Sequence, residues 1–144
     1  DIEECFPWEV AALQAQHPDL LLVDVREPYE YAAMHLSGSL LVPRGVLESA
    51  VEYDYEETEP ELVQARQRPV LLICRSGNRS VLAAKTLKLL GFERPISLKT
   101  GLRGWNDAEL PLVDVAGVTV APEAADAYFT PKLRPEQLAP KRRG

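Results

Sequence analysis

The stretch VLLICRSGNRSVLAAKTLKLLG, from Val70 to Gly91, decides the fold. Its first part, Val70–Cys74, is a continuous apolar run, which is typical of a strand that is buried on both faces of a sheet. A helical pattern follows from Arg79 to Leu90, and Gly91 suits its C-cap. The apolar positions of this helix share one stripe, formed by Ala83, Ala84, Leu87 and Leu90. A buried strand that leads directly into a helix predicts a parallel sheet covered by helices.

The same alternation of strand and helix patterns extends along the chain in both directions. Further strands are predicted at Ile2–Phe6, Leu20–Val25, Ser39–Val42 and Pro95–Leu98. Further helices are predicted at Glu27–Met34, Arg44–Val51, Glu61–Arg66 and Leu102–Ala108. One more helix begins at Pro7, and its apolar face is expected to hold Trp8, Ala11, Ala12 and Ala15. We therefore predict an α/β fold with one central, mostly parallel sheet that is flanked by helices on both faces.

The chain is expected to divide near Val113, where this pattern decays. Residues 1–113 are predicted to form the domain, and residues 114–144 a Pro-rich C-terminal extension that is basic at its end. Four prolines punctuate the extension: Pro122, Pro131, Pro135 and Pro140. The end itself, Lys141-Arg142-Arg143, is expected to be disordered or to pack on a second copy of the protein.

The composition argues against several classes of protein. The net charge of −6 is unfavourable for wholesale nucleic-acid binding, and no apolar run approaches the ~18 residues of a membrane span. Two cysteines without a CxxC motif, and two histidines that lie far apart, predict no metal site. A free reactive thiol favours a reducing, cytoplasmic location. The chain begins with Asp1, so a removed signal peptide or a trimmed start stays open.

The segment Glu48–Glu61 holds seven acids and no base. It is predicted to be a solvated loop that runs into a helix. If it overhung the functional site, it would repel anionic substrates and attract a basic protein partner instead.

The loop CRSGNR combines a thiol with features that bind anions. Sites in parallel sheets lie at the carboxyl ends of strands, where Cys74 is expected. Gly77 permits a tight loop whose N–H groups converge, and the N-terminus of the following helix adds partial positive charge. Arg75 and Arg79 add full charges. All of these favour the thiolate, so Cys74 is expected to be largely ionised at neutral pH without a histidine base.

A thiolate in a positive cradle suits an electrophile that is itself an anion. It could attack phosphorus or arsenic in an oxyanion, or the outer sulfur of thiosulfate or a related sulfane donor. Cysteine phosphatases enclose a phosphoryl group with the spacing C-x5-R, whereas Cys74 and Arg79 have the spacing C-x4-R. The shorter loop leaves less room for phosphate and favours the sulfur donor.

The other polar candidates are expected to support the site rather than react. Arg75 is predicted to face the donor, and Arg79 to stabilise the loop on backbone carbonyls or on an acid. Asp24 and Arg26 are predicted to pair near the site, with each other or with Glu30, and Arg103 could line the rim of the pocket. Structural roles, in a turn or in the core, are predicted for His35, Cys5 and Trp105. A resolving-thiol role for Cys5 is the alternative.

Three motifs together resemble the rhodanese-like sulfurtransferases in their single-domain form. The loop CRSGNRS is similar to the family's Cys-Arg-x-Gly-x-Arg-Ser. The stretch LLLVDVREPYEYAAMHLSGSLLVP resembles the family's first signature, and ISLKTGLRGWNDAELPLV its C-terminal signature. The resemblance covers Ile2 to Val113. Five positions depart from the family's usual residues: Met34, Thr100 and Glu109 where glycine is usual, Ser37 where proline is usual, and Ser39 where alanine is usual.

The resemblance implies sulfur transfer in two steps. Cys74 would take the outer sulfur of a small anionic donor such as thiosulfate and become a persulfide, and a thiol, a protein or cyanide would then accept the sulfur. The donor and the persulfide would be held by the rest of the loop, namely Arg75, Ser76, Gly77, Asn78, Arg79 and Ser80. No metal, organic cofactor, nucleic acid or membrane is implied. The alternatives are a persulfide carrier or regulatory protein-binding module with little thiosulfate turnover, and a phosphatase or arsenate reductase.

Overall fold

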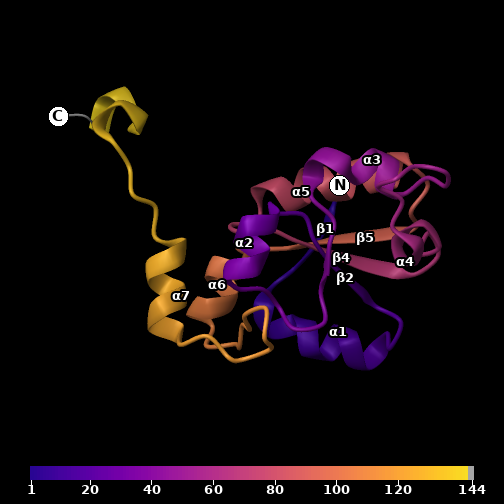
Figure 1. Ribbon diagram of the computed structural model, residues 1–144, viewed down its shortest axis with the longest axis horizontal. Coiled ribbons are helices and arrows are strands. Elements are labelled where there is room, and N and C mark those ends of the chain that lie inside the picture. The colour runs from indigo at the N-terminus through magenta and orange to yellow at the C-terminus, as the bar shows by residue number, and fades with distance from the viewer. Residues whose placement is uncertain (143–144) are drawn as a thin grey trace.

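The computed structural model describes residues 1–142 of the chain. It contains one sheet of five strands, β1 (Glu3–Cys5), β2 (Leu21–Asp24), β3 (Leu40–Leu41), β4 (Pro69–Ile73) and β5 (Arg94–Leu98). The strands are ordered β1-β5-β4-β2-β3, and every neighbouring pair is parallel (Figure 1). This confirms the predicted α/β class and the parallel sheet. Each strand end lies within one residue of its predicted position.

Helices join the strands and cover the sheet. In the described residues the α-helices are α1 (Val10–Gln16), α2 (Pro28–Ala33), α3 (Leu47–Ala50), α4 (Pro60–Val63), α5 (Asn78–Leu89), α6 (Gly101–Asp107) and α7 (Pro122–Phe129). Short 3₁₀ turns are η1 (Pro7–Glu9), η2 (Arg44–Val46), η3 (Pro135–Gln137) and η4 (Pro140–Arg142). No helix within residues 1–142 is both long enough and apolar enough to cross a bilayer.

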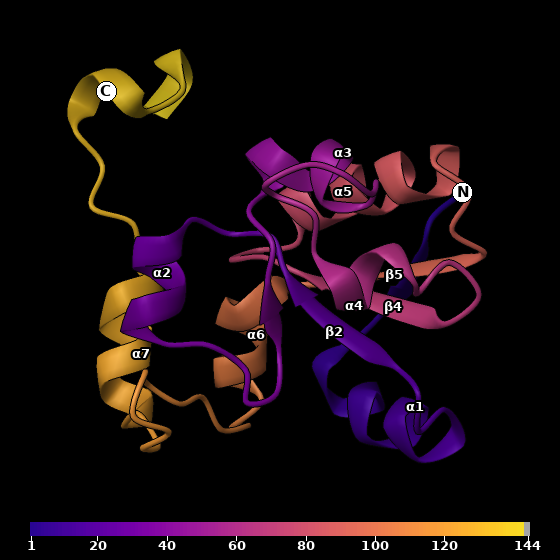
Figure 2. The same cartoon turned by 45° about the vertical axis from the view of Figure 1, so that its right-hand side comes forward.

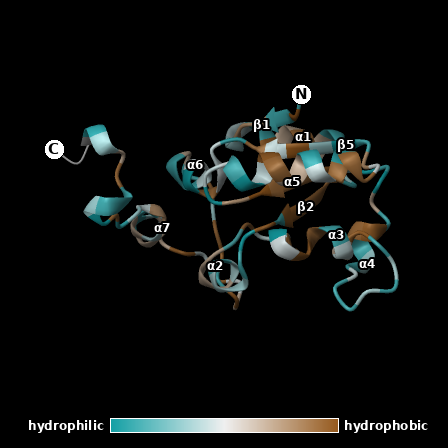
Figure 3. Cartoon of the chain, turned by 90° about the horizontal axis from the view of Figure 1, so that it is seen from above, coloured by the Kyte–Doolittle hydropathy of each residue, from teal (hydrophilic) through white to brown (hydrophobic). Residues whose placement is uncertain are grey.

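The sheet lies between two apolar clusters because its strands alternate their side chains between the two faces. Val70 and Leu72 of β4 pack with residues of α3, α4 and α5, whereas Leu71 and Ile73 pack with residues of α1, α6 and α7. All five residues of β4 are buried. Figure 3 shows β2 as hydrophobic and the loop between α3 and α4 as mostly hydrophilic. Cys74, which directly follows β4, therefore lies at the carboxyl edge of a buried central strand.

The first helix buries a different face from the predicted one. Pro7 begins the 3₁₀ turn η1, and the α-helix starts only at Val10. The helix buries Val10 and Leu13, while Trp8 is 65% exposed. The tighter 3₁₀ turn changes the angular position of every later residue. For this reason the prediction of a buried face formed by Trp8, Ala11, Ala12 and Ala15 is wrong.

The C-terminal extension contains a helix that the sequence pattern does not predict. Pro122 occupies the first turn of α7, where a missing N–H breaks no helical hydrogen bond. Ala125 and Phe129 are each 1% exposed and join the apolar cluster on the α6 side of the sheet. Accordingly, α7 lies against α6 and next to α2 (Figures 1 and 2). Arg143, in the basic end for which disorder is predicted, lies outside the described residues.

Candidate active site

Cys74 lies between β4 and α5, and its sulfur caps the helix. Gly77, the N-cap of α5, has a φ of +99°, a left-handed conformation that glycine adopts without strain. This turn brings the backbone N–H groups of Gly77 and Ser80 to 3.1 and 3.3 Å from Cys74 Sγ. These N–H groups are among those that a helix leaves unpaired at its start, and the dipole of α5 favours negative charge on the sulfur. Cys74 itself is 1% exposed.

The segment that begins α6 braces the cysteine loop. Leu102 and Arg103 donate their N–H groups to the carbonyl oxygens of Cys74 and Arg75, at 2.9 and 3.0 Å. Gly101 has a φ of +61°, and a Cβ on it would lie 2.4 and 2.5 Å from the carbonyl carbon and oxygen of Arg75. Only glycine fits at that position. The C-terminal motif therefore positions the cysteine loop, although it lies more than twenty residues further along the chain.

Two buried serines continue the hydrogen bonding from the sulfur into the sheet. Cys74 Sγ lies 3.3 Å from Ser80 Oγ, which lies 2.7 Å from Ser97 Oγ on β5. Neither serine is exposed. The contact with Ser97 holds the Ser80 hydroxyl beside the sulfur. Ser97 is absent from the predicted site residues, and the signal that could have shown it is a lone hydroxyl within the apolar strand β5.

Glu30 and Arg79 form a bidentate ion pair beside the loop. Arg79 Nη1 and Nη2 donate to Glu30 Oε2 and Oε1 at 2.9 and 3.0 Å. Burial raises the pKa of the Glu30 carboxyl, but hydrogen bonds from Arg79 and from the backbone N–H of Glu27 outweigh burial and leave the pKa below its ordinary value. The hydrogen bond to Glu30 raises the pKa of Arg79. The acid that Arg79 contacts is thus on α2, and the pair ties α2 to the start of α5.

Asp24 and Arg26 form a second, fully buried pair. Arg26 Nη2 donates to Asp24 Oδ2 at 2.8 Å and to the carbonyl oxygen of Met34 at 2.7 Å. Of the two predicted partners, Arg26 contacts Asp24 and not Glu30. Arg26 Nη1 is the one buried side-chain nitrogen or oxygen without a hydrogen-bond partner in the part of the chain that the structure describes. Because buried donors are usually paired, this N–H has capacity for a further acceptor.

The side chain of Arg75 contacts the C-terminal extension. Its Nη2 donates to the carbonyl oxygen of Phe129 at 2.6 Å. Arg75 also lines a cavity of about 420 Å³ whose other walls come from α7 and the segment that follows it. The structure therefore places the arginine that is expected to face the donor between the cysteine loop and α7.

Three other predicted residues, Ser76, Asn78 and Arg103, are exposed. Ser76 and Arg103 line a second cavity of about 470 Å³, together with Trp8 and Thr100. Arg103 thus lies at the rim of a cavity that adjoins the cysteine loop.

His35 and Trp105 have the structural contacts expected of them. His35 Nδ1 lies 2.8 Å from the carbonyl oxygen of Tyr31, and the two rings stack with their centroids 3.8 Å apart. Trp105 is buried, and its Nε1 donates to the carbonyl oxygen of Pro111 at 2.9 Å.

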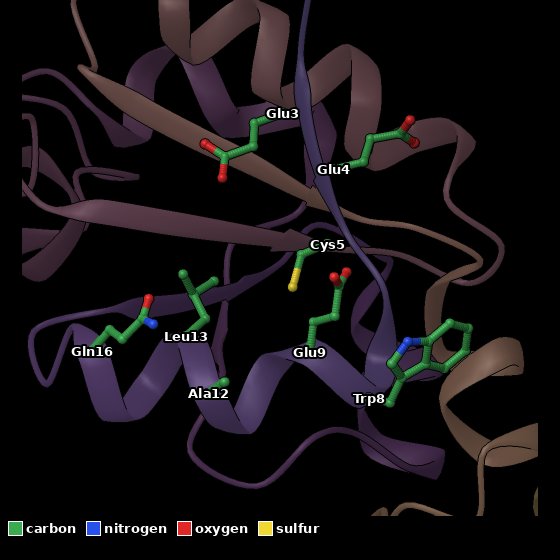
Figure 4. Close-up of a pocket in the computed structure, with 8 residues that line it drawn as sticks. All are labelled: Glu3, Glu4, Cys5, Trp8, Glu9, Ala12, Leu13 and Gln16. Carbon is green, nitrogen blue, oxygen red and sulfur yellow. The ribbon is translucent and has the colours of Figure 1, made fainter.

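Cys5 lies away from the cysteine loop. It pairs with Leu98 in the sheet and lines a cavity of about 380 Å³, where Figure 4 shows it between β1 and the residues of α1. Both cysteines are free. Burial, together with the charges of Glu9 and Glu3, raises the pKa of the Cys5 thiol to about 11. A protonated thiol is a poor nucleophile, which favours the core role over the resolving role.

The acidic segment Glu48–Glu61 does not overhang the cysteine loop. It lies at the end of the molecule opposite α7 in Figure 1. Three of its acids pair with arginines, and these are Glu48 with Arg44, Glu52 with Arg66 and Glu61 with Arg68. Within residues 1–142, no group of three or more His, Cys, Asp or Glu side chains could hold a metal ion.

Comparison with known proteins agrees with this geometry. A family model described as a rhodanese-like domain matches residues 7–108. The chain is 30% identical over 95 residues to the thiosulfate sulfurtransferase GlpE of Tolumonas auensis, across 66% of this chain and 80% of that protein. It is 35% identical over 86 residues to the putative sulfur carrier protein YrkF of Bacillus subtilis, across 60% of this chain and 41% of that protein.

A solved structure from Rhodopseudomonas palustris has a TM-score of 0.69 and 28% identity, across 77% of this chain and 84% of that one. That protein is described as of unknown function and as a possible tyrosine phosphatase. The matched part of the present chain spans about half the length, 54% and 41%, of the first curated relatives. The family match includes Glu30, the cysteine loop and the segment that begins α6. This chain therefore belongs to the rhodanese-like family of sulfurtransferases and sulfur carriers.

Proposed function

We propose that this protein transfers sulfane sulfur from thiosulfate, or a similar small anionic donor, to a thiol or cyanide through a persulfide on Cys74. In the first step, the Cys74 thiolate attacks the outer sulfur of thiosulfate. The S–S bond of the donor breaks, sulfite leaves with the electron pair, and the outer sulfur stays on Cys74. In the second step, the acceptor attacks that sulfur, the new S–S bond breaks, and Cys74 Sγ regains its electron pair.

The observation that carries this proposal is the pair of N–H donors on Cys74 Sγ. Gly77 and Ser80 donate at 3.1 and 3.3 Å, so negative charge on the sulfur is stabilised without a histidine base. The same donors favour the return of the thiolate when the persulfide is consumed. Arg75, which directly follows Cys74, would supply positive charge for the departing sulfite.

A phosphatase is the less favoured alternative. The arginine that closes a phosphate-binding loop must turn its N–H groups toward the phosphoryl oxygens. Here both terminal nitrogens of Arg79 are occupied by Glu30. The short C-x4-R loop and this ion pair together argue for sulfur as the atom that Cys74 attacks.

A persulfide carrier with little thiosulfate turnover is the closer alternative. It needs the same cysteine, and the 1% exposure of Cys74 together with the contact between Arg75 and α7 is consistent with slow access for a donor. Either role requires a reduced thiol, which suits a cytoplasmic location.

Intact-protein mass spectrometry after incubation with thiosulfate, followed by a thiocyanate assay on the same sample, tests the proposal. We expect the wild-type protein and the matched control Cys5→Ser to gain one sulfur that a reductant removes, and to release thiocyanate on addition of cyanide. The variant Cys74→Ser should do neither. Thiocyanate production by Cys74→Ser would overturn the mechanism, whereas loading of the wild type with slow release would identify a carrier.

A further inference from the structure

The outer face of α5 carries an apolar groove near the C-terminal end of the helix. The volume of this groove is about 370 Å³. It is lined by Asp1, Ile2, Lys85, Lys88 and Leu89. Leu89 is 88% exposed, and Leu82, which lies two turns earlier on the same face of α5, is 57% exposed. Since helices usually bury their leucines, this face of α5 has the character of a contact surface.

The groove is also cationic. Within residues 1–142, neither Lys85 nor Lys88 forms an ion pair, and Asp1 is the one acid in the lining. The methylene stems of lysines cover apolar surface while their ammonium groups stay available to an anion. A segment that combines large apolar or aromatic side chains with carboxylates would therefore match both parts of the groove.

The acidic loop, residues 52–58 between α3 and α4, carries side chains of this kind. Two tyrosines and three acids of the loop are exposed, namely Tyr53, Tyr55, Asp54, Glu56 and Glu57. The tyrosines are 62% and 57% exposed. In the described part of the chain, none of the three acids forms an ion pair. Exposed tyrosines are frequent anchors of protein interfaces.

Hydrogen bonds within the loop hold it in one conformation. Thr58 Oγ1 accepts from the backbone N–H of Tyr55 at 3.0 Å and donates to the carbonyl oxygen of Glu52. The backbone N–H of Thr58 donates to the carbonyl oxygen of Tyr55 at 3.1 Å. A loop that is already ordered loses little conformational entropy when a partner binds it.

The groove and the acidic loop lie on the same face of the molecule. Arg66 connects them, because its Nε donates to the carbonyl oxygen of Leu90 at the end of α5, at 3.1 Å, and its Nη2 lies 3.6 Å from Glu52 Oε1. Figures 1 and 2 both show α3, which leads into the loop, beside α5. Two copies related by a twofold axis can therefore exchange their loops, so that the same contact forms twice.

We propose that this face is a dimer interface, in which the acidic loop of each copy occupies the α5 groove of a second copy. Tyr53 and Tyr55 cover the apolar part of the groove, and the acids of the loop pair with Lys85 and Lys88. Cys74 lies at the other end of α5, which is about 18 Å long because it has 12 residues. The dimer therefore leaves the cysteine loop open, and loading of Cys74 does not depend on it.

Sedimentation velocity between about 1 µM and 1 mM, the range in which small interfaces dissociate, tests the dimer. The wild-type protein should sediment as a dimer at the upper end of this range. The groove variant Lys85→Glu/Lys88→Glu should weaken the dimer at least about tenfold, because like charges then face each other. The matched control Lys132→Glu/Lys141→Glu makes the same change in net charge at exposed positions of the extension, and its dimer affinity should stay within about twofold of the wild type.

A mixture of two variants tests whether the loop is the occupant of the groove. The loop variant Glu56→Lys/Glu57→Lys should be as weak a dimer as the groove variant when each is alone. In an equimolar mixture, the wild-type loop meets the wild-type groove at one contact and the two reversed sets of charges meet at the other, so the dimer should return. Tyr55→Ser should also weaken the wild-type dimer, whereas Tyr29→Ser, on α2 and 71% exposed, should not.

Circular dichroism of each variant should match the wild type, since all of these positions are exposed. A wild-type protein that stays monomeric to about 1 mM would overturn the interface. So would a dimer that neither reversal weakens, or a mixture of folded variants that fails to restore it, as expected if a different basic protein binds the loop. The interface does not rest on the proposed function: failure of thiosulfate to load Cys74 would count against that function and leave the dimer untouched.

Discussion

Cys5 and Cys74 are both buried and form no disulfide, yet the hydrogen-bonding groups around their sulfur atoms differ. Cys74 Sγ accepts two N–H groups at the start of a helix. Cys5 Sγ has no such donors in the described residues and lies 3.5 Å from the carbonyl oxygen of Phe6. Burial, as the larger cause, and the charges of Glu9 and Glu3, as the smaller one, raise the pKa of the Cys5 thiol to about 11. Burial alone therefore does not describe the environment of either cysteine, because the hydrogen-bond partners of the two sulfurs differ.

This contrast predicts the pH dependence of Cys5 alkylation. In the Cys74→Ser variant, the rate of reaction of Cys5 with iodoacetamide should rise about tenfold per pH unit above neutral pH, because only the thiolate reacts and the thiol predominates below its pKa. The rise should continue toward the pKa of about 11. Mass spectrometry of timed samples measures the rate. A plateau near pH 9, typical of an unperturbed cysteine, would contradict the assigned environment.

Three departures from the usual family glycines have different consequences for the backbone. Thr100 and Glu109 have φ values of +67° and +63°, so they keep a conformation that favours glycine. Met34 has a φ of −168°, which any residue adopts, and its side chain is buried in the core. Strain is therefore expected at Thr100 and Glu109 and not at Met34.

The variant Thr100→Gly should be more stable than the wild type by about 0.5–1 kcal/mol. A left-handed conformation costs a residue with a Cβ roughly 1–2 kcal/mol, and the added chain entropy of glycine offsets about half of the relief. Urea denaturation measures the free energy of unfolding. Met34→Gly is the opposite control, and it should lose about 3 kcal/mol because a buried side chain is removed without relief of strain. Destabilisation by Thr100→Gly would show that the contacts of its side chain outweigh the strain.

At the scale of elements, the pair of Glu30 and Arg79 links α2 to the helix that Cys74 caps. Glu30→Gln should lower the free energy of unfolding by about 1–2 kcal/mol at pH 7, since a bidentate charge-assisted contact is lost while Arg79 stays partly hydrated. Glu57→Gln, at an exposed position in the acidic loop, is the matched control and should change the free energy by less than about 0.5 kcal/mol.

The same pair predicts a dependence on pH. The folded-state pKa of Glu30 lies below its ordinary value, so the unfolded chain binds a proton first as the pH falls. The stabilisation by Glu30 is complete above the unfolded pKa of about 4.3 and is lost as the pH falls through the folded pKa. The difference in stability between wild type and Glu30→Gln should therefore shrink below about pH 4. A difference that is constant between pH 7 and pH 3 would rule out an ionic origin.

Elements whose pattern is set by local packing could be predicted from the sequence. The apolar run of β4 predicted the strand, because a strand that is buried on both faces consists almost entirely of apolar residues. The apolar stripe of α5 predicted the helix, and the two together located the loop between them. The side-chain direction of Arg75 could not be predicted, since its partner is a backbone carbonyl on a distant helix. Ser97 and Glu30 contact the loop only because the sheet order brings β5 and α2 to it.

At the scale of the whole molecule, the folded unit is larger than the family match. The match ends at residue 108, whereas Ala125 and Phe129 complete the apolar cluster that also contains Leu102 and Trp105 of α6. The eight residues of α7 include few large apolar side chains, so their pattern is too short to predict a helix. The buried ring of Phe129 nevertheless packs α7 against the core. The division near Val113 stays a prediction, and the stability of variants in α7 can decide it.

Phe129→Ala should lower the free energy of unfolding by about 3 kcal/mol, because a ring that is 1% exposed leaves a cavity when it is removed. Val115→Ala, at a position of the extension that is 75% exposed, should change it by less than about 0.5 kcal/mol. Because the Phe129 carbonyl holds Arg75, the loss of this anchor should also alter the KM for thiosulfate, which Val115→Ala should leave unchanged. A loss of less than about 1 kcal/mol for Phe129→Ala would mean that α7 is not part of the core, and the extension would then be a separate appendage of the 1–113 domain.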